Sequence, residues 1–450
     1  MTRSAWKISI MNRLFNFGKT VLENNSNIFS LFRYIPYSMR LGKSYKEHKR
    51  LICWYENSSV AERRVFHFDS LKNILDYAYH NIPFYEELYS LHNYHPREFG
   101  CLEDFNNVPI INKDDLRKHD LERRSINLPG AIRSNTGGTS GSPLSFNLDD
   151  KTFAREWAYM HNIWARLGYN YLDAKLTFRG KNIGEKALMY NVVHNEYIVN
   201  AYVDVAHIVE SVSNLAKRNP IKYLHGYPSA IYEFCRYLQE SGMSTHDLFQ
   251  GQLIGVFFGS EYPAPQYRNL VEEVLGVPTL SWYGHSECAV LAFETTPFHY
   301  NTFPTYGYAE AVKQDNQDEF SLLSTGYYNK ASPFIRYDTG DLIKAPCWSD
   351  GVLSQFQISS GRTGDFIVDS NNKRISLTAL IFGRHHSAFD KVMFIQIRNP
   401  AIGRATLVVT TDNDVSMSDF DLSNVDIEFD LETVKVPVKT NTGKTPLLIK

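Results

Sequence analysis

The stretch SNTGGTSGSPLSF (residues 134–146) concentrates Gly, Ser and Thr and then changes to alternating apolar and polar residues. LPGAIR precedes it and LSFNLDD follows it, so we interpret it as a turn between two short extended segments rather than an interdomain linker. Its glycines allow positive φ, which lets backbone N–H groups converge on an anion, and its hydroxyls add donors. An ordinary surface turn has the same composition, and the Gly-Lys-Ser/Thr ending of a nucleoside-triphosphatase P-loop is absent.

The composition is that of an ordinary globular chain. Of 450 residues, 43% are hydrophobic and 21% charged, which allows roughly two to four domains and a sizeable core. The formal net charge is −2, from 47 basic and 49 acidic residues, and gives no electrostatic reason to expect a nucleic-acid partner. The oligomeric state is left open.

Cysteine usage and hydropathy indicate the compartment. The five cysteines are scattered, odd in number and free of C-x-x-C pairs, which predicts a reduced, cytoplasmic setting. Polar residues interrupt the N-terminal apolar segment, so no secretory signal is expected, and no window approaches the ~20 apolar residues of a membrane span. Residues 6–22 (WKISIMNRLFNFGKTVL) fit either a basic amphipathic helix on a membrane surface or a helix packed on the body.

Helical spacing dominates the first 100 residues, where SLKNILDYAYHNIPFYEELYSL (residues 70–91) repeats apolar positions until Pro83 interrupts it. A further helix is predicted for KTFAREWAYMHNIWARLG (residues 151–168), capped by Asp149 or Asp150 and ended by Gly168. His161 lies off its apolar stripe. The stripe, which we expect to face the core, consists of Phe153, Trp157, Met160, Trp164 and Leu167.

Between about residues 170 and 300, short apolar runs alternate with helical segments. The runs are AKLTFRG, YIVNAYV, IKYLHGY, LIGVFFG and TLSWYG. This alternation predicts a largely parallel sheet covered by helices, in which ligands bind where the strands end. GSE (Gly259, Ser260, Glu261) and YGHSE (residues 283–287) each follow one of these runs directly.

Beyond about residue 300 the predicted strands become shorter and more antiparallel. SGRTGDFIVDSNNKRISL (residues 360–377) predicts a hairpin that opens a final segment of about 85 residues, long enough for a small α+β domain. We therefore expect an α/β protein. Its large domain, residues 1–364, holds mostly parallel sheets flanked by helices plus a smaller β-rich subdomain, and a small mobile α+β domain spans residues 365–450.

Five polar clusters stand in order along the chain: the glycine-rich loop, YGHSE, FIRYDTGDL (residues 334–342), GRTGD (residues 361–365) and TNTGK (residues 440–444). With NIPFYEELY, VPIINKDDLRK and YLHGYPSAIYEFCRYL, they resemble the adenylate-forming superfamily. The likeness is to the phenylacetate–coenzyme A ligase group and its capsule-biosynthesis relatives, and it runs over nearly the whole chain.

The resemblance implies an ATP- and Mg²⁺-dependent ligase that activates a small carboxylic acid as an acyl-adenylate, releases pyrophosphate and passes the acyl group to an acceptor, by default coenzyme A. An amide-forming ligase of capsule or O-antigen polysaccharide biosynthesis is an alternative acceptor chemistry. A catalytically degenerate scaffold of the same fold is the alternative outside the enzymes. The carboxylic acid itself is not encoded by any short motif.

The glycine-rich loop is the implied phosphate site. Pro143 is followed by Leu144, where the superfamily often has Lys, so positive charge must come from elsewhere. The residues that the resemblance places on the outer phosphates, through backbone and hydroxyl donors, are Thr136, Gly138, Thr139, Ser140 and Gly141.

YGHSE is the implied adenine and metal segment, in which Tyr283 and Gly284 lie near adenine, Ser286 reaches the α-phosphate and Glu287 helps to hold Mg²⁺. The resemblance adds GSE to the ATP site. We expect a catalytic role for Glu287 in addition to its place at the metal.

The later motifs supply the remaining groups. The resemblance implies that Asp341 accepts both ribose hydroxyls, that Arg362 contacts ribose or phosphate, and that Asp365 is the hinge residue. Lys444 is the implied catalytic lysine, whose ammonium bridges the substrate carboxylate and the α-phosphate. Asp338 stands where the superfamily commonly has Arg, which puts the local salt-bridge network in question.

Two further sets of residues carry weaker expectations. An acyl pocket is expected to include Tyr227, Phe258 and Trp282. Zinc is not expected, because the thiols and imidazoles near YGHSE have no close cysteine pairing, and His385 and His386 are expected on the surface. The thiols and imidazoles concerned are Cys288, His285, His299 and Cys347.

Overall fold

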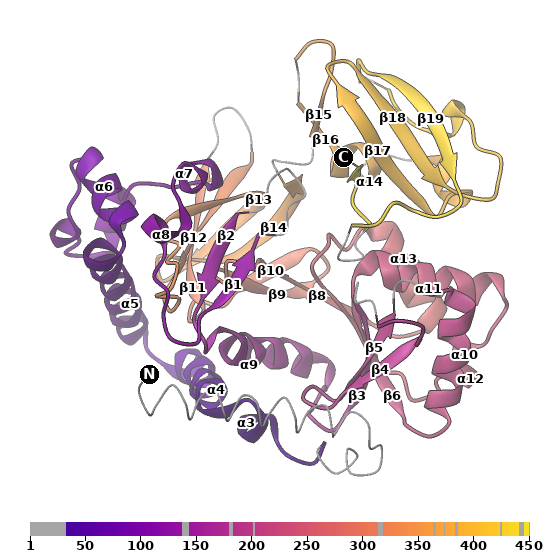
Figure 1. Cartoon of the computed structure of the whole chain (residues 1–450), viewed down its shortest axis with the longest axis horizontal. Helices are drawn as coiled ribbons and strands as arrows, with labels where there is room; N and C mark the ends of the chain where they lie inside the picture. The colour runs from indigo at the N-terminus through magenta and orange to yellow at the C-terminus, as the bar shows by residue number, and fades with distance from the viewer. Residues whose placement is uncertain are drawn as a thin grey trace.

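The computed structural model describes residues 33–136, 144–179, 183–200, 203–313, 318–362, 366–372, 374–382, 386–423, 425–440 and 445–449 (Figure 1). The predicted amphipathic segment at residues 6–22 lies outside them. No helix of the described part combines the length and apolar character needed to span a bilayer.

Helices dominate the described N-terminal part, as predicted. They are α3 (Tyr37–Arg40), α4 (Gly42–Asn57), α5 (Val60–Asn81), α6 (Pro83–Leu91), α7 (Lys113–Arg117) and α8 (Leu121–Arg124). A capping box begins α5, because the Ser59 side chain accepts from the backbone N–H of Glu62 and the Glu62 side chain accepts from that of Ser59. Pro83 ends α5 and begins α6, where its missing N–H and fixed φ suit the first helical position.

The glycine-rich loop is closed at its base by a hairpin, which confirms the two predicted extended segments. Strands β1 (Ile132–Asn135) and β2 (Ser145–Leu148) pair antiparallel. The Thr136 N–H donates to Leu144 O at 2.9 Å, and the Leu144 N–H donates to Thr136 Oγ1 at 3.0 Å. Residues 137–143, and with them Gly138, Thr139, Ser140 and Gly141, lie outside the described part.

A twelve-stranded sheet forms the centre of the molecule, in the order β11-β12-β13-β14-β10-β9-β8-β7-β6-β3-β5-β4. The neighbours β5, β3, β6, β7 and β8 pair parallel, and β4 (Leu188–Asn191) closes this edge antiparallel. Each of the five predicted apolar runs contains one parallel strand, so the α/β prediction is confirmed. These strands are β3 (Ala174–Arg179), β5 (Glu196–Asn200), β6 (Ile221–Gly226), β7 (Gly255–Phe258) and β8 (Thr279–Gly284).

Helices cover both faces of the parallel part (Figure 1). On one face a buried cluster that includes Leu224, Val256 and Phe258 packs under four helices. On the other face Tyr223 and Phe257 pack with Trp164 of α9 (Thr152–Trp164). The four helices are α10 (Val205–Ala216), α11 (Pro228–Glu240), α12 (Thr245–Leu248) and α13 (Pro265–Leu275).

The buried face of α9 is wider than the predicted stripe. Phe153 is 50% exposed, whereas His161 is buried and its Nδ1 lies 3.0 Å from the Tyr45 hydroxyl of α4. The prediction was wrong for Phe153, while the burial of His161, which lies off the predicted stripe, follows because α9 contacts α4 as well as the sheet. The cap also differs, since Lys151 is the N-cap, and Asp149, two positions earlier, accepts the Lys151 N–H at 2.8 Å.

The other half of the large sheet is antiparallel, as predicted, but its strands are not short. β13 spans 13 residues and β14 spans 11. The pairing register of these two strands shifts between Asp341 and Trp348, and β-bulges of this kind bend a strand and increase its local twist. The strands of this half are β9 (Leu291–Thr296), β10 (His299–Thr302), β11 (Gly307–Lys313), β12 (Phe320–Gly326), β13 (Tyr337–Ser349) and β14 (Val352–Arg362).

The C-terminal part contains the predicted hairpin and strands. β15 (Phe366–Val368) pairs antiparallel with β16 (Arg374–Ser376), and α14 (Leu377–Phe382) follows. A four-stranded sheet has the order β19-β18-β17-β20 and its own buried cluster, which includes Ile397 and Leu407. Its strands are β17 (Phe394–Ala401), β18 (Arg404–Thr410), β19 (Glu428–Val434) and β20 (Leu448–Ile449). The boundary at residues 364/365 stays a prediction.

Candidate active site

Two of the predicted motifs meet through a buried hydrogen bond. Tyr283, near the end of β8, donates its hydroxyl to Asp341 Oδ2 of β13 at 2.6 Å. Both residues are buried, and Asp341 lies opposite Arg362 of β14 in the strand register. The long antiparallel hairpin therefore brings the YDTGDL carboxylate to the strand end that carries YGHSE.

Glu287 is held as a buried, ionised carboxylate. The Ser286 hydroxyl donates to its Oε2 at 3.1 Å, the Tyr337 hydroxyl donates to its Oε1 at 3.2 Å, and His285 Nδ1 lies 3.3 Å from Oε2. Burial acts to raise the pKa of Glu287, but the adjacent His285 imidazole and the hydrogen bonds outweigh it and lower the pKa to about 2. The oxygens of an ionised carboxylate are ligands that Mg²⁺ accepts.

No role in nucleotide binding is expected from the sequence for Tyr337 or for His285. Both lie inside the quoted motifs, FIRYDTGDL and YGHSE, so membership of a motif is the signal that could have found them. Their partner could not be read from the sequence, because Tyr337 stands 50 positions after Glu287.

Asp338 stands where the superfamily commonly has Arg, and the ion pair next to YDTGDL is made by Arg336 instead. Asp338 accepts the N–H of Gly340 at 2.9 Å, and burial raises the pKa of its carboxyl group, with Asp341 adding to the effect. Arg336 pairs with Glu310 at 3.0 Å and donates to Asn106 O and Val108 O. An arginine network thus exists two positions earlier in the chain.

GSE connects to helix α11. The Trp282 ring covers Gly259 so closely that a Cβ there would stand 1.9 Å from a ring carbon. Ser260 has a φ of +68°, and Glu261 Oε2 accepts the Ser229 N–H in the first turn of α11 at 3.2 Å. The strand-end turn therefore anchors the helix N-terminus, and its role toward ATP stays a prediction.

The three residues expected in the acyl pocket have different surroundings, and their role stays a prediction. Trp282 stacks on His225, with ring centroids 5.6 Å apart, on the face covered by α9. Phe258 is completely buried on the opposite face, under α11 and α13, because side chains alternate along a strand. Tyr227 is partly buried as the N-cap of α11.

Several predicted residues cannot be located. Asp365 and Lys444 lie outside the described residues, as does His385, and only the backbone of Arg362 is described. His386 is buried rather than on the surface, because its ring nitrogens contact Leu380 O and the Asp421 N–H at 2.8 and 2.9 Å.

Cys288, His299 and Cys347, three of the residues considered for zinc, lie in different surroundings. The Cys288 thiol donates to Ser286 O at 3.4 Å, the His299 ring contacts Pro297 O and Gln357, and Cys347 is exposed. Within the described ranges, no three His, Cys, Asp or Glu side chains gather as a metal site would require.

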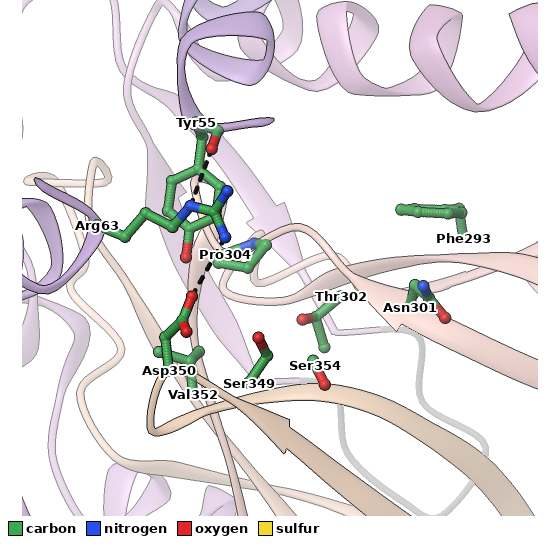
Figure 2. A pocket seen from close by; sticks show the side chains of 10 residues that line it. All are labelled: Tyr55, Arg63, Phe293, Asn301, Thr302, Pro304, Ser349, Asp350, Val352 and Ser354. Carbon is green, nitrogen blue, oxygen red and sulfur yellow. Dashed lines mark hydrogen bonds and ion pairs between the residues drawn. The ribbon is translucent and has the colours of Figure 1, made fainter. Parts of the chain in front are cut away.

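A pocket lies at the turn of the β13–β14 hairpin, whereas Asp341 lies near the other end of β13. Figure 2 shows the side chains that line this pocket. Its wall contains the ion pair between Arg63 and Asp350, at 3.2 Å, and the Arg63 Nε–H also donates to Tyr55 O at 3.1 Å. None of the residues predicted for ATP or carboxylate binding is among those that line it.

Comparison with known proteins agrees with the fold and the motifs. No protein-family model matches the chain. It is similar to Protein CapK of Staphylococcus aureus, 24% identical over 347 residues that cover 74% of this chain and 73% of the relative. A phenylacetate-coenzyme A ligase of Pseudomonas putida is 22% identical over 343 residues, which cover 70% and 73% of the two chains.

A solved 2-hydroxyisobutyryl-CoA ligase in the postadenylation state aligns with a TM-score of 0.63, at 16% identity, over 86% of this chain and 90% of that chain. These similarities agree with the resemblance to the adenylate-forming superfamily. The fold of the chain is also similar to that of a GH3.15 acyl acid amido synthetase, with a TM-score of 0.57 at 14% identity, over 84% and 90% of the two chains.

Proposed function

We propose that this protein is an ATP-dependent ligase that activates a small carboxylic acid as an acyl-adenylate and transfers the acyl group to coenzyme A. The observation that carries the proposal is the convergence of Glu287 and Asp341. YGHSE and YDTGDL interlock through two hydrogen bonds, from Tyr283 to Asp341 and from Tyr337 to Glu287. Such a pair of buried acids, one at a strand end and one on the neighbouring hairpin, suits a nucleotide that needs both a cation and a ribose acceptor.

The two acids have different tasks in this proposal. Asp341 accepts hydrogen bonds from the ribose hydroxyls, and the Tyr283 hydroxyl fixes its orientation. Glu287 fits Mg²⁺, because its pKa of about 2 keeps it ionised and its oxygens are held by three neighbouring side chains. When bound, Mg²⁺ would neutralise charge on the phosphate oxygens.

Adenylation needs positive charge at the reacting atoms. A carboxylate oxygen of the substrate attacks the α-phosphorus, a new P–O bond forms, and the bond to pyrophosphate breaks. We assign Lys444 to this charge, with Thr136 and the 137–143 loop on the outer phosphates and Arg362 at ribose or phosphate. In the second step a thiolate attacks the acyl carbon and AMP leaves, after rotation about Asp365.

The test is a panel of aromatic, fatty, sugar and amino acids incubated with ATP and Mg²⁺, scored by release of AMP and pyrophosphate. We expect at least one acid to release both, and coenzyme A to be consumed in a one-to-one ratio with AMP. Amine acceptors form the second arm, and acyl transfer to an amine but not to coenzyme A would replace the thioester proposal with the amide-forming alternative. Lys444→Ala should abolish acid-dependent pyrophosphate exchange, and an unchanged rate would contradict the mechanism.

A further inference from the structure

Arg336, the residue directly before β13, adopts a left-handed backbone conformation with a φ of +49°. A residue other than glycine adopts this conformation at an energetic cost, which the surrounding contacts must offset. The Arg336 N–H donates to Thr325 Oγ1 at 2.8 Å, and the guanidinium pairs with Glu310 at 3.0 Å. The guanidinium also donates to Asn106 O at 2.6 Å and to Val108 O at 2.7 Å. This side chain, which is only 7% exposed, therefore holds the backbone in the turn that leads into β13.

Residues 106–111, which precede α7, also fix the backbone on both sides of Tyr337. The Ile111 N–H donates to Arg336 O at 3.2 Å, and Ile111 O accepts the Asp338 N–H at 2.8 Å. Ile111 and Tyr337 are thus paired as in a parallel sheet. The N-terminal part of the chain consequently sets the direction in which the Tyr337 side chain leaves β13.

The Tyr337 side chain extends from this fixed backbone to Glu287. It is buried, and its ring centroid lies 5.0 Å from that of Phe334. Its hydroxyl donates to Glu287 Oε1 at 3.2 Å. Because a tyrosine side chain has only two rotatable bonds, the backbone and the ring packing together determine where the hydroxyl lies. A continuous series of contacts therefore joins residues 106–111 to Glu287.

We propose that Arg336 and Tyr337 are positioning residues that orient Glu287 for Mg²⁺, so that the N-terminal helical part supports the metal site. The inference rests on the proposed function, in which Glu287 holds Mg²⁺. Hydrogen bonds from outer residues orient the ligands of a metal, and their loss typically lowers metal affinity about 10- to 100-fold. The donors of Arg336 are directed at Glu310 and at two backbone carbonyls, so we expect its effect on Glu287 to pass through Tyr337.

The test is calorimetric titration of ATP into the full chain, without any carboxylic acid, in Mg²⁺ and again in EDTA. The ratio of the Kd in EDTA to the Kd in Mg²⁺ measures how much the cation strengthens ATP binding. We expect Tyr337→Phe to lower this ratio about tenfold and to change the Kd in EDTA by less than about twofold, because the lost hydroxyl contacts Glu287 and not the nucleotide. Arg336→Lys should lower the ratio about threefold in wild type and by less than about 1.5-fold in the Tyr337→Phe background.

Two matched controls separate positioning from a general loss of stability. Tyr159→Phe removes another buried hydroxyl, which donates to Thr305 O at 2.9 Å, and Arg268→Lys weakens another buried ion pair, which Arg268 forms with Glu294 at 2.8 Å. Both controls should lower the free energy of unfolding and leave the ratio within about twofold of wild type. Glu287→Gln should bring the ratio close to one.

A wild-type ratio in Tyr337→Phe would overturn the inference, and so would an equal loss from Arg336→Lys in both backgrounds or a similar loss in the two controls. Glu310→Gln tests the same network should Arg336→Lys fail to fold, with the same expected loss. If ATP binding by the wild-type protein does not depend on Mg²⁺, the metal role of Glu287 in the proposed function fails together with the inference. Mg²⁺-dependent binding that is equally strong in wild type and in Tyr337→Phe rejects only the roles of Arg336 and Tyr337.

Discussion

The hydrogen bond from Tyr283 to Asp341 makes a quantitative test of the nucleotide site. Tyr283→Phe removes one oxygen and leaves the ring, which packs against Phe356, in place. A buried hydrogen bond from a hydroxyl to a carboxyl oxygen at 2.6 Å contributes about 1.5–3 kcal/mol. We expect about 1.5 kcal/mol of this to appear in ATP binding, which is roughly a tenfold rise in Kd, and the rest in the free energy of unfolding.

Calorimetric titration of ATP, without acid, measures the Kd, and the KM for ATP checks it in turnover. A double-mutant cycle with Asp341→Asn separates orientation from simple loss of packing. If Tyr283 acts by orienting Asp341, its removal from the Asp341→Asn background should cost at least about 1 kcal/mol less than its removal from wild type. An unchanged Kd in Tyr283→Phe, or effects that add within about 0.3 kcal/mol, would refute the reasoning.

Three further predictions concern stability. Arg268→Met leaves the buried Glu294 carboxylate without its bidentate partner at 2.8 and 2.9 Å, so the free energy of unfolding in denaturant should fall by about 3–5 kcal/mol. Burial lowers the pKa of His67 from 6.5 to about 4, so the unfolded chain binds the proton first. Stability should therefore decline as pH falls from 6.5 to 4, by up to about 3 kcal/mol, and His67→Gln should flatten this part of the pH profile. Gly259→Ala places a Cβ 1.9 Å from the Trp282 ring, and thermal unfolding should show a loss of about 1–3 kcal/mol that is smaller in a Trp282→Ala background.

Local patterns predicted the elements of the parallel half well. The five apolar runs became β3, β5, β6, β7 and β8 because each is a short β-rich run bounded by helical or turn sequence. Pro83 separated α5 from α6 at the expected residue, and the glycine-rich stretch joined two paired strands. In each case the deciding interaction lies within a few residues along the chain.

Contacts between distant residues could not be predicted. The burial of His161 depends on the Tyr45 hydroxyl, 116 positions earlier, and the orientation of Asp341 depends on Tyr283, 58 positions earlier. The length of β13 and β14 was missed because β13 ends in a largely exposed run, residues 344–349, which contains Pro346 and resembles loop sequence. The motifs predicted which residues lie close together, but not which atoms form hydrogen bonds.

Strand β8 limits how the two halves of the large sheet can move relative to each other. It pairs parallel with β7 and antiparallel with β9, so one uninterrupted hydrogen-bond lattice joins the two halves of the large sheet. Bending the sheet at β8 would break backbone hydrogen bonds from this strand to β7 and to β9. We therefore expect the rotation that the proposed two-step reaction requires to occur outside the large sheet, while the sheet itself stays rigid.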